Sequence, residues 1–417
     1  MERIDSKERR ILTLTCCGHF LSHFNMLVFP AILIPLSTQL GMDMAYVLGL
    51  SFWMYLLFGI TALPWGMAAD RWGATVFLSI FYAGAGICGL MAAFFIDSPL
   101  KFSLCLAGIG LFSGIYHPVG LGWISKDIKR VSLGMAYNGM FGNLGLATAP
   151  LLAGLVNWIW SPKAVYIMLG IVNFAGLILM SIAPKSASDR KGAETKKSEP
   201  DDSQSSVRGF LVLLVAMMLG GIAYRGATVI MPAWFEIRNQ DMYQWFSSLF
   251  GTGISKNLLA TISMSFIYFI GMIGQYTGGH AAERFDLKLC YLLFHMFTIP
   301  AAFLMTWAFD IPLIILSLVY FFFLLGMQPV ENTLVAKFTP ARFHHSAYGA
   351  KFVLTFGVGS FSVKMIEIIK AKAGIAYVFP CLGTVSIILI CVIILMIFKT
   401  PPLQSHDKSF IKENESV

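Results

Sequence analysis

The sequence consists mainly of apolar segments long enough to cross a lipid bilayer. A helix needs about 20 apolar residues to cross about 30 Å of hydrocarbon. Only 12% of the residues are charged, about half the share found in soluble domains. This pattern predicts an all-α membrane protein and excludes soluble globular and disordered proteins. The twelve transmembrane helices are expected near 11–37, 44–69, 74–96, 102–125, 131–157, 164–184, 209–235, 258–282, 288–309, 311–337, 346–369 and 375–398.

A polar segment divides the twelve spans into two sets of six. Residues 185–208 are rich in Ser, Lys, Glu and Asp and contain almost no apolar side chains, which is typical of a solvated linker. We therefore expect an N-terminal half at 1–184, a cytoplasmic linker at 185–208, a C-terminal half at 209–398 and a cytoplasmic tail at 399–417.

The distribution of Lys and Arg predicts the orientation in the membrane. With the N-terminus inside, the cytoplasmic segments contain 21 of these residues and the outer loops contain 6. Because basic loops are retained in the cytoplasm, both termini are expected there, in the inner or plasma membrane. The apolar stretch after Arg10 lacks a small-residue cleavage site, so we expect it to remain as the first span.

The sequence predicts no cofactor and no metal site. The seven cysteines all lie within apolar segments without the spacing of metal ligands, so they are interpreted as small hydrophobic residues. Three histidines within the spans have no acidic or thiolate cluster beside them, which argues against a transition metal. A nucleotide-binding Gly-x-x-x-x-Gly-Lys-Ser/Thr loop is also missing from the sequence, which argues against ATP as the energy source.

The two halves carry an internal repeat. Gly66-Met-Ala-Ala-Asp70-Arg71 recurs as Gly279-His-Ala-Ala-Glu283-Arg284, 213 positions later, and His117-Pro118 recurs as Gln328-Pro329 at 211. His23 lies seven residues before Pro30, as Arg225 lies seven before Pro232, at an offset of only 202. Because the offset rises from 202 to 213 along the C-terminal half, about eleven extra residues are inserted between Glu236 and Asn257. There we expect a short helix in the membrane interface.

These features resemble the major facilitator superfamily of transporters. The loop motif Gly-x-x-x-Asp-Arg-x-Gly of that family is matched by Gly66, Asp70, Arg71 and Gly73. The resemblance implies two six-helix bundles related by a pseudo-two-fold axis along the membrane normal, in a chain that acts as a monomer. The stretch 110–118, which ends in Tyr116-His117-Pro118, and the Gly-rich stretch 139–150 are similar to the fosmidomycin-resistance-type exporters.

The resemblance implies that spans one, four, seven and ten line a central cavity. Each of these spans carries polar groups near its middle, whereas an ionisable group facing hydrocarbon would cost several kcal/mol. The expected substrate-binding residues are His19, His23, Asn25, Tyr116, His117, Tyr224, Arg225 and Gln328. His23 and Arg225 are expected to oppose each other near the midplane.

The chemistry of these groups favours an anionic substrate and a proton. Arg225 offers a planar fork that fits a carboxylate, phosphonate or phosphate, and histidines take up protons near neutral pH. Either Glu331 or His117 is expected to carry the coupling proton. Alternatively, Glu331 is a structural partner of Lys351, which lies at a similar depth.

The repeated loop predicts a gating latch rather than a binding site. Asp70, Arg71, Glu283 and Arg284 are expected at the cytoplasmic ends of spans two and eight. There the two acids can accept hydrogen bonds from the facing half and stabilise the outward-open state.

The sequence thus predicts proton-linked export of a small amphipathic organic anion, and it argues against an enzyme. The direction stays open, because the fourth span lacks the basic residue of many antiporters and Ala149 replaces a usual glycine in the fifth. The alternatives are a broad exporter of lipophilic compounds or lipids and a non-transporting scaffold or sensor with the same fold.

Overall fold

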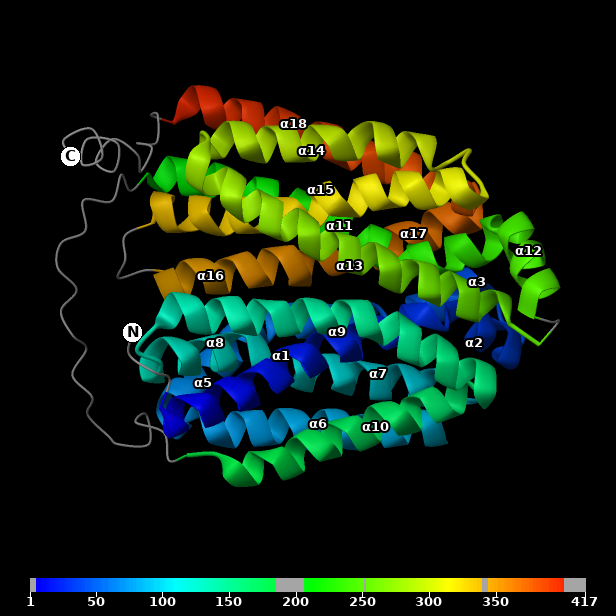
Figure 1. The fold of residues 1–417 in the computed structure, drawn as a ribbon, viewed down its shortest axis with the longest axis horizontal. Coiled ribbons are helices and arrows are strands. Elements are labelled where there is room, and N and C mark those ends of the chain that lie inside the picture. The colour runs from blue at the N-terminus through cyan, green and yellow to red at the C-terminus, as the bar shows by residue number, and fades with distance from the viewer. Residues whose placement is uncertain (1–4, 185–205, 251–252, 340–343, 401–417) are drawn as a thin grey trace.

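The computed structural model describes residues 5–184, 206–250, 253–339 and 344–400, and its regular structure over these ranges is helical (Figure 1). The N-terminal half contains α1 (Ser6–Ala31), α2 (Leu33–Leu40), α3 (Met44–Gly49), α4 (Phe52–Ile60), α5 (Ala62–Trp72), α6 (Ala74–Phe94), α7 (Pro99–Ser113), α8 (Tyr116–Asp127), α9 (Val131–Ile159) and α10 (Pro162–Leu179). The C-terminal half contains α11 (Val207–Arg238), α12 (Gln240–Phe250), α13 (Lys256–Arg284), α14 (Leu287–Leu304), α15 (Asp310–Phe338), α16 (His344–Phe352), α17 (Phe361–Lys372) and α18 (Val378–Lys399). The expected linker and tail lie almost wholly outside the described residues.

The helices agree with the predicted spans in number and position. Within the described ranges, eleven helical segments are long and apolar enough to cross a membrane. A pair of helical segments bent by 115°, 33–40 and 44–60, raises the number to as many as twelve. The all-α fold predicted from the sequence is confirmed. The span expected at 44–69 is divided into α3, α4 and α5.

Two of the spans are interrupted near their polar residues. In the fourth span, α7 ends at Ser113 and α8 begins at Tyr116, because Pro118 has no N–H to donate back along the helix. In the eleventh span, a π-helical turn at Val353–Gly357 separates α16 from the remainder. Single π-turns occur often at functional sites in helical proteins.

The start of α1 follows from its first four residues. Asp5 accepts a hydrogen bond from the Glu8 N–H at 2.8 Å, and the Glu8 carboxylate accepts one from the Asp5 N–H at 3.1 Å. This reciprocal capping box satisfies two donors that a helix start leaves free. The Glu8 carboxylate also accepts the Lys129 N–H at 2.7 Å, which fixes α1 to the loop between α8 and α9.

The two halves are packed tightly at the end opposite to the chain termini, hereafter the far end. α1 begins and α18 ends at the termini end (Figure 1). At the far end, the Asn257 amide donates to the Ala31 carbonyl at 2.8 Å, and the rings of Phe52 and Phe361 lie 5.5 Å apart.

An ion pair adds a polar contact between the halves at the far end. Lys370 of α17 donates a hydrogen bond to the Asp43 carboxylate, which also caps the first turn of α3 through the Ala45 N–H. The hydrogen bond from Lys370, followed by that from Ala45, holds the pKa of Asp43 below its ordinary value. The carboxylate therefore stays ionised, and the ion pair intact, to a lower pH than that of a free aspartate.

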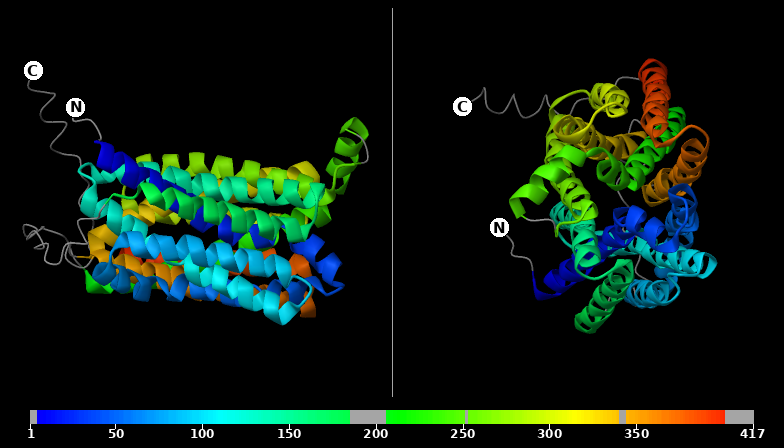
Figure 2. Two further views of the ribbon diagram at one scale, coloured as in Figure 1. Left: turned by 90° about the horizontal axis from the view of Figure 1, so that it is seen from below. Right: turned by 90° about the vertical axis from the view of Figure 1, so that its right-hand side faces the viewer.

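The inserted segment in the C-terminal half forms the helix predicted for it. Gln240–Phe250 is helical as α12, and Figure 2 shows it projecting from the bundle at the far end. The Asp310 carboxylate accepts a hydrogen bond from the Met242 N–H at 2.9 Å, which anchors α12 to the start of α15. Its position in the membrane interface stays a prediction.

Closure of the cavity toward the far end depends on a glycine pair near the middle of the spans. A Cβ atom added to Gly59 of α4 would lie 2.1 Å from the Gly357 backbone nitrogen, in the π-turn of the other half. We predict that Gly59→Val prevents this closure, because backbone atoms cannot move aside as a side chain can. A cysteine placed at Phe52, in a variant without the native cysteines, should react faster with a membrane-impermeant thiol reagent.

Gly139→Ala serves as the control for this experiment, because a Cβ at Gly139 meets no atom within 4 Å. It should leave the labelling rate unchanged. An unchanged rate in folded Gly59→Val would show that the glycine contact does not close the far end.

Candidate functional site

A cavity of about 1200 Å³ lies between the two halves. It extends from His23 and Tyr224 in the interior to Asp70 and Lys126 at the termini end, and both halves contribute to its lining. The Asp70–Lys126 ion pair is exposed, so the mouth of the cavity faces the termini end. Because the far end is closed, the cavity is accessible from the termini end.

Three histidines form a cluster on the N-terminal wall of the cavity. His19 and His23 lie one turn apart on α1, with Nε2 atoms separated by 3.1 Å. His117 of α8 meets both rings edge-on, at centroid distances of 5.2 and 5.1 Å. The structure thus brings His19 and His23, which share one face of α1, together with His117 of α8 on the cavity wall.

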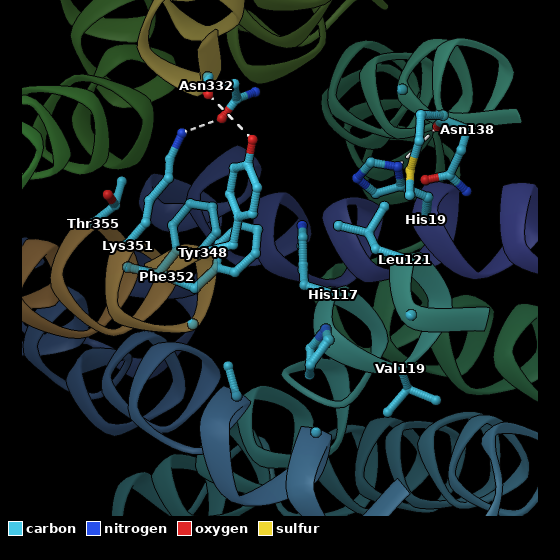
Figure 3. A pocket seen from close by; sticks show the side chains of 18 of the residues that line it. His19, His117, Val119, Leu121, Asn138, Asn332, Tyr348, Lys351, Phe352 and Thr355 are labelled. Carbon is cyan, nitrogen blue, oxygen red and sulfur yellow. Dashed lines mark hydrogen bonds between the residues drawn. The ribbon is translucent and has the colours of Figure 1, made fainter. Parts of the chain in front are cut away.

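The hydrogen bonds of His19 determine its tautomer. Its Nδ1 lies 2.8 Å from the Asn138 backbone carbonyl (Figure 3), and a carbonyl only accepts hydrogen bonds. Nδ1 therefore carries the hydrogen, and neutral His19 presents the lone pair of Nε2 to His23. His23 donates to that lone pair through its own Nε2.

Two of the predicted binding residues support this wall from behind. The Tyr116 ring stacks on His19 at 5.0 Å, and its hydroxyl accepts a hydrogen bond from the Asn138 amide at 2.6 Å. Asn25 exchanges hydrogen bonds with Asn173 and donates to Ser113, all within the N-terminal half. Tyr116 and Asn25 are almost fully buried and do not line the cavity in this conformation.

The opposite wall carries a buried ion pair. The Lys351 ammonium lies 2.7 Å from the Glu331 carboxylate and also donates to the Asn332 side chain at 2.5 Å (Figure 3). The Tyr291 hydroxyl donates to Glu331 at 3.0 Å. The partnership of Glu331 with Lys351, one of the two alternatives left open by the sequence, is thus present in the structure.

Arg225 is buried behind the cavity wall. Its side chain is 3% exposed, and the guanidinium lies 4.1 Å above the ring of Tyr55 in a cation–π contact. Its Nε has no hydrogen-bond partner, and no carboxylate within the described ranges forms an ion pair with it. The neighbouring residue Tyr224 lines the cavity. Arg225 thus has one unused donor, its Nε–H, but does not itself line the cavity in this conformation.

A chain of side-chain amides connects the halves across the cavity. Gln328 of α15 accepts a hydrogen bond from Gln275 of α13 at 2.7 Å, and Gln275 accepts one from Asn143 of α9. Gln328 was predicted from the sequence, but Asn143 and Gln275 were missed. Their only sequence signal is an amide within an apolar span, and neither lies on the four spans that the resemblance assigns to the cavity.

The residues of the predicted latch do not join the two halves in this conformation. Asp70 pairs with Lys126 of the same half at 2.6 Å, and the Arg71 guanidinium lies 5.2 Å from the ring of Trp72. Glu283 and Arg284 end α13. Since the mouth is open here, a latch that closes it in the other state stays a prediction.

The sequence and the fold both match a known transporter family. Residues 15–363 match the model of the Major Facilitator Superfamily. The chain belongs to this superfamily. No curated protein matches the sequence.

Solved structures of superfamily transporters share the fold. A D-xylose-proton symporter is 13% identical, with a TM-score of 0.73 over 95% of this chain and 99% of its own. The nucleoside transporter NupG is 16% identical, with a TM-score of 0.71 over 92% of this chain and 99% of its own. A peptide transporter bound to sulfate is 14% identical, with a TM-score of 0.71 over 94% of each chain. These identities establish the fold and leave the substrate open.

Membership in the superfamily confirms the main expectation from the sequence. The protein is a multi-pass membrane transporter and not an enzyme. The finer similarity to fosmidomycin-resistance-type exporters stays a prediction.

Proposed function

We propose that this superfamily member is a secondary active transporter that exports a small amphipathic organic anion across the plasma membrane, driven by the proton gradient. The observation that carries the proposal is the guanidinium of Arg225, buried with an unpartnered Nε beside the cavity residue Tyr224. A buried cation with free donor capacity is stabilised when an anion reaches it. The apolar part of the substrate would contact residues such as Phe352 and Phe356.

The proposed transport cycle follows from the two ends of the cavity. With both termini in the cytoplasm, as the Lys and Arg distribution predicts, the conformation described above faces inward. Substrate enters past Asp70 and Lys126, and the halves then rock to close this mouth and open both the glycine contact and the far end. Export is proposed on the resemblance of the 110–118 stretch to the exporter branch.

The coupling proton is proposed to bind at Glu331. Its carboxylate is the acid of the buried pair with Lys351 and faces the same cavity as the substrate. Protonation would neutralise Glu331 and break its ion pair with Lys351. Export driven by an inward proton gradient requires proton and substrate to be carried in opposite directions, so the proton would bind Glu331 in the outward-open state and be released inside before the next substrate is exported.

The anion proposal is tested with purified protein and a panel of aryl carboxylates and aryl phosphonates in a thermal-shift assay. We expect at least one of them to stabilise the protein. Arg225→Lys keeps the positive charge but loses the planar guanidinium that can donate two parallel hydrogen bonds. The affinity of this variant for the anion should fall about 10- to 100-fold, the range expected for charge-assisted hydrogen bonds. Arg238→Gln, at the far end of the same helix, is the matched control and should retain full affinity.

Two results would contradict the anion proposal. One is stabilisation by neutral or cationic lipophilic compounds alone, which favours the alternative of a lipophilic exporter. The other is full-strength anion binding by Arg225→Gln.

The coupling proposal is tested with Glu331→Gln and the double variant Glu331→Gln/Lys351→Met in proteoliposomes. If Glu331 carries the proton, the single variant should exchange substrate but fail to accumulate it against a gradient under a pH difference. If the pair is purely structural, the free energy of unfolding should instead fall by about 3–5 kcal/mol in the single variant and recover in the double variant. A stable Glu331→Gln protein that still accumulates substrate would refute the coupling role.

A further inference from the structure

We propose that His19, His23 and His117 form a binding site for a transition-metal ion that prefers imidazole ligands, with Zn²⁺ as the reference ion. This site is separate from the anion contact at Arg225 and does not depend on the proposed transport function. The sequence argued against a metal because no acid or thiolate accompanies the histidines. The arrangement in the structure changes that interpretation.

The spacing of the ring nitrogens fits a metal ion with small adjustments. One ligand atom from each of the three histidines lies within 4.8 Å of the others, and the Nε2 atoms of His19 and His23 are 3.1 Å apart. In a tetrahedral zinc site with Zn–N distances of about 2.0–2.1 Å, two nitrogens lie about 3.3 Å apart. The His19–His23 pair is thus close to ligand spacing, and His117 reaches it by a small ring movement.

The second hydrogen bond of His19 is the kind that prepares a metal ligand. A ligating histidine usually donates its other ring N–H to a carbonyl or carboxylate, which fixes the tautomer and the ring orientation. His19 does so through Nδ1–H to the Asn138 carbonyl, so its Nε2 lone pair points to the cluster. Tyr116 reinforces this arrangement by stacking on His19 and accepting a hydrogen bond from the Asn138 side chain.

The ligand set is sufficient without a carboxylate or a thiolate. Three histidines and one water form the coordination of the His₃ class of zinc sites, in which every protein ligand is neutral. His19, His23 and His117 all line the cavity, so water can supply the fourth ligand and the ion can enter from the open mouth. Imidazole ligands favour Zn²⁺, Cu²⁺ and Ni²⁺ over Mg²⁺ and Ca²⁺.

The test is a titration of the purified full-length chain with ZnCl₂ by calorimetry, with the bound metal counted by mass spectrometry. We expect one Zn²⁺ per chain that Mg²⁺ does not displace. His19→Gln, His23→Gln and His117→Gln should each weaken binding by more than about 100-fold, because loss of a ligand costs more than loss of its supporting group. Each variant is first checked for an unchanged melting temperature without metal.

His280→Gln is the matched control. His280 is an exposed histidine of α13 that hydrogen-bonds the Tyr276 carbonyl of its own helix, and its replacement should leave zinc affinity unchanged. X-ray absorption at the zinc edge should show imidazole nitrogens at about 2.0 Å.

Three results would overturn the proposal. The first is that the folded native chain binds no zinc, which would leave the three histidines as a packed cluster with one hydrogen bond between His19 and His23. The second is zinc binding that survives in all three histidine variants. The third is a sulfur shell at about 2.3 Å, which would assign the metal to cysteines such as Cys16 or Cys17.

Discussion

The cost of exposing charged side chains to hydrocarbon determines where this protein can place its chemistry. An ionisable group in the bilayer needs a partner or a water-filled cavity, and the chain supplies both between its two halves. Lys351 and Glu331 neutralise each other on one wall, and on the other His19 forms hydrogen bonds with His23 and with the Asn138 carbonyl. The outer surface of the spans remains apolar, as Ile178 and Phe398 illustrate with exposed fractions of 74% and 81%. The membrane-spanning fold and the site therefore follow from the same constraint.

The contact between the halves is built to separate. Near mid-span it relies on the close approach of Gly59 and Gly357, and at the far end on the ring contact of Phe52 with Phe361 and on the ion pair of Asp43 with Lys370. Glycine contacts bring backbones together without interlocking side chains, so they can part at low cost. Along the cavity, the hydrogen bond from Asn143 to Gln275 and the ring contact of His117 with Phe352 cross between the halves. This combination is suited to rocking about a central site.

Hydropathy predicted the spans well because it sums a signal over about 20 residues, and the differing offsets of the repeat predicted the helix α12. The repeat also drew attention to His23, His117, Arg225 and Gln328. What the sequence could not predict depends on tertiary packing. The π-turn at Val353–Gly357 contains no proline that would mark it in the sequence. The burial of Arg225 against Tyr55 depends on a side-chain rotamer set by neighbouring helices. Likewise, the metal-like spacing of three histidines depends on how α8 restarts after its break.

The central claim is that one cavity opens alternately at the two ends. The most direct measurement is a pair of distance distributions by pulsed electron spin resonance in proteoliposomes. Spin labels replace the exposed Trp72 and Phe285 at the termini end, or the exposed Tyr46 and Tyr377 at the far end. The account predicts two populations for each pair, with the short-distance fraction at one end rising by as much as it falls at the other when pH or substrate is changed. A single unchanging distance at the far end would contradict it.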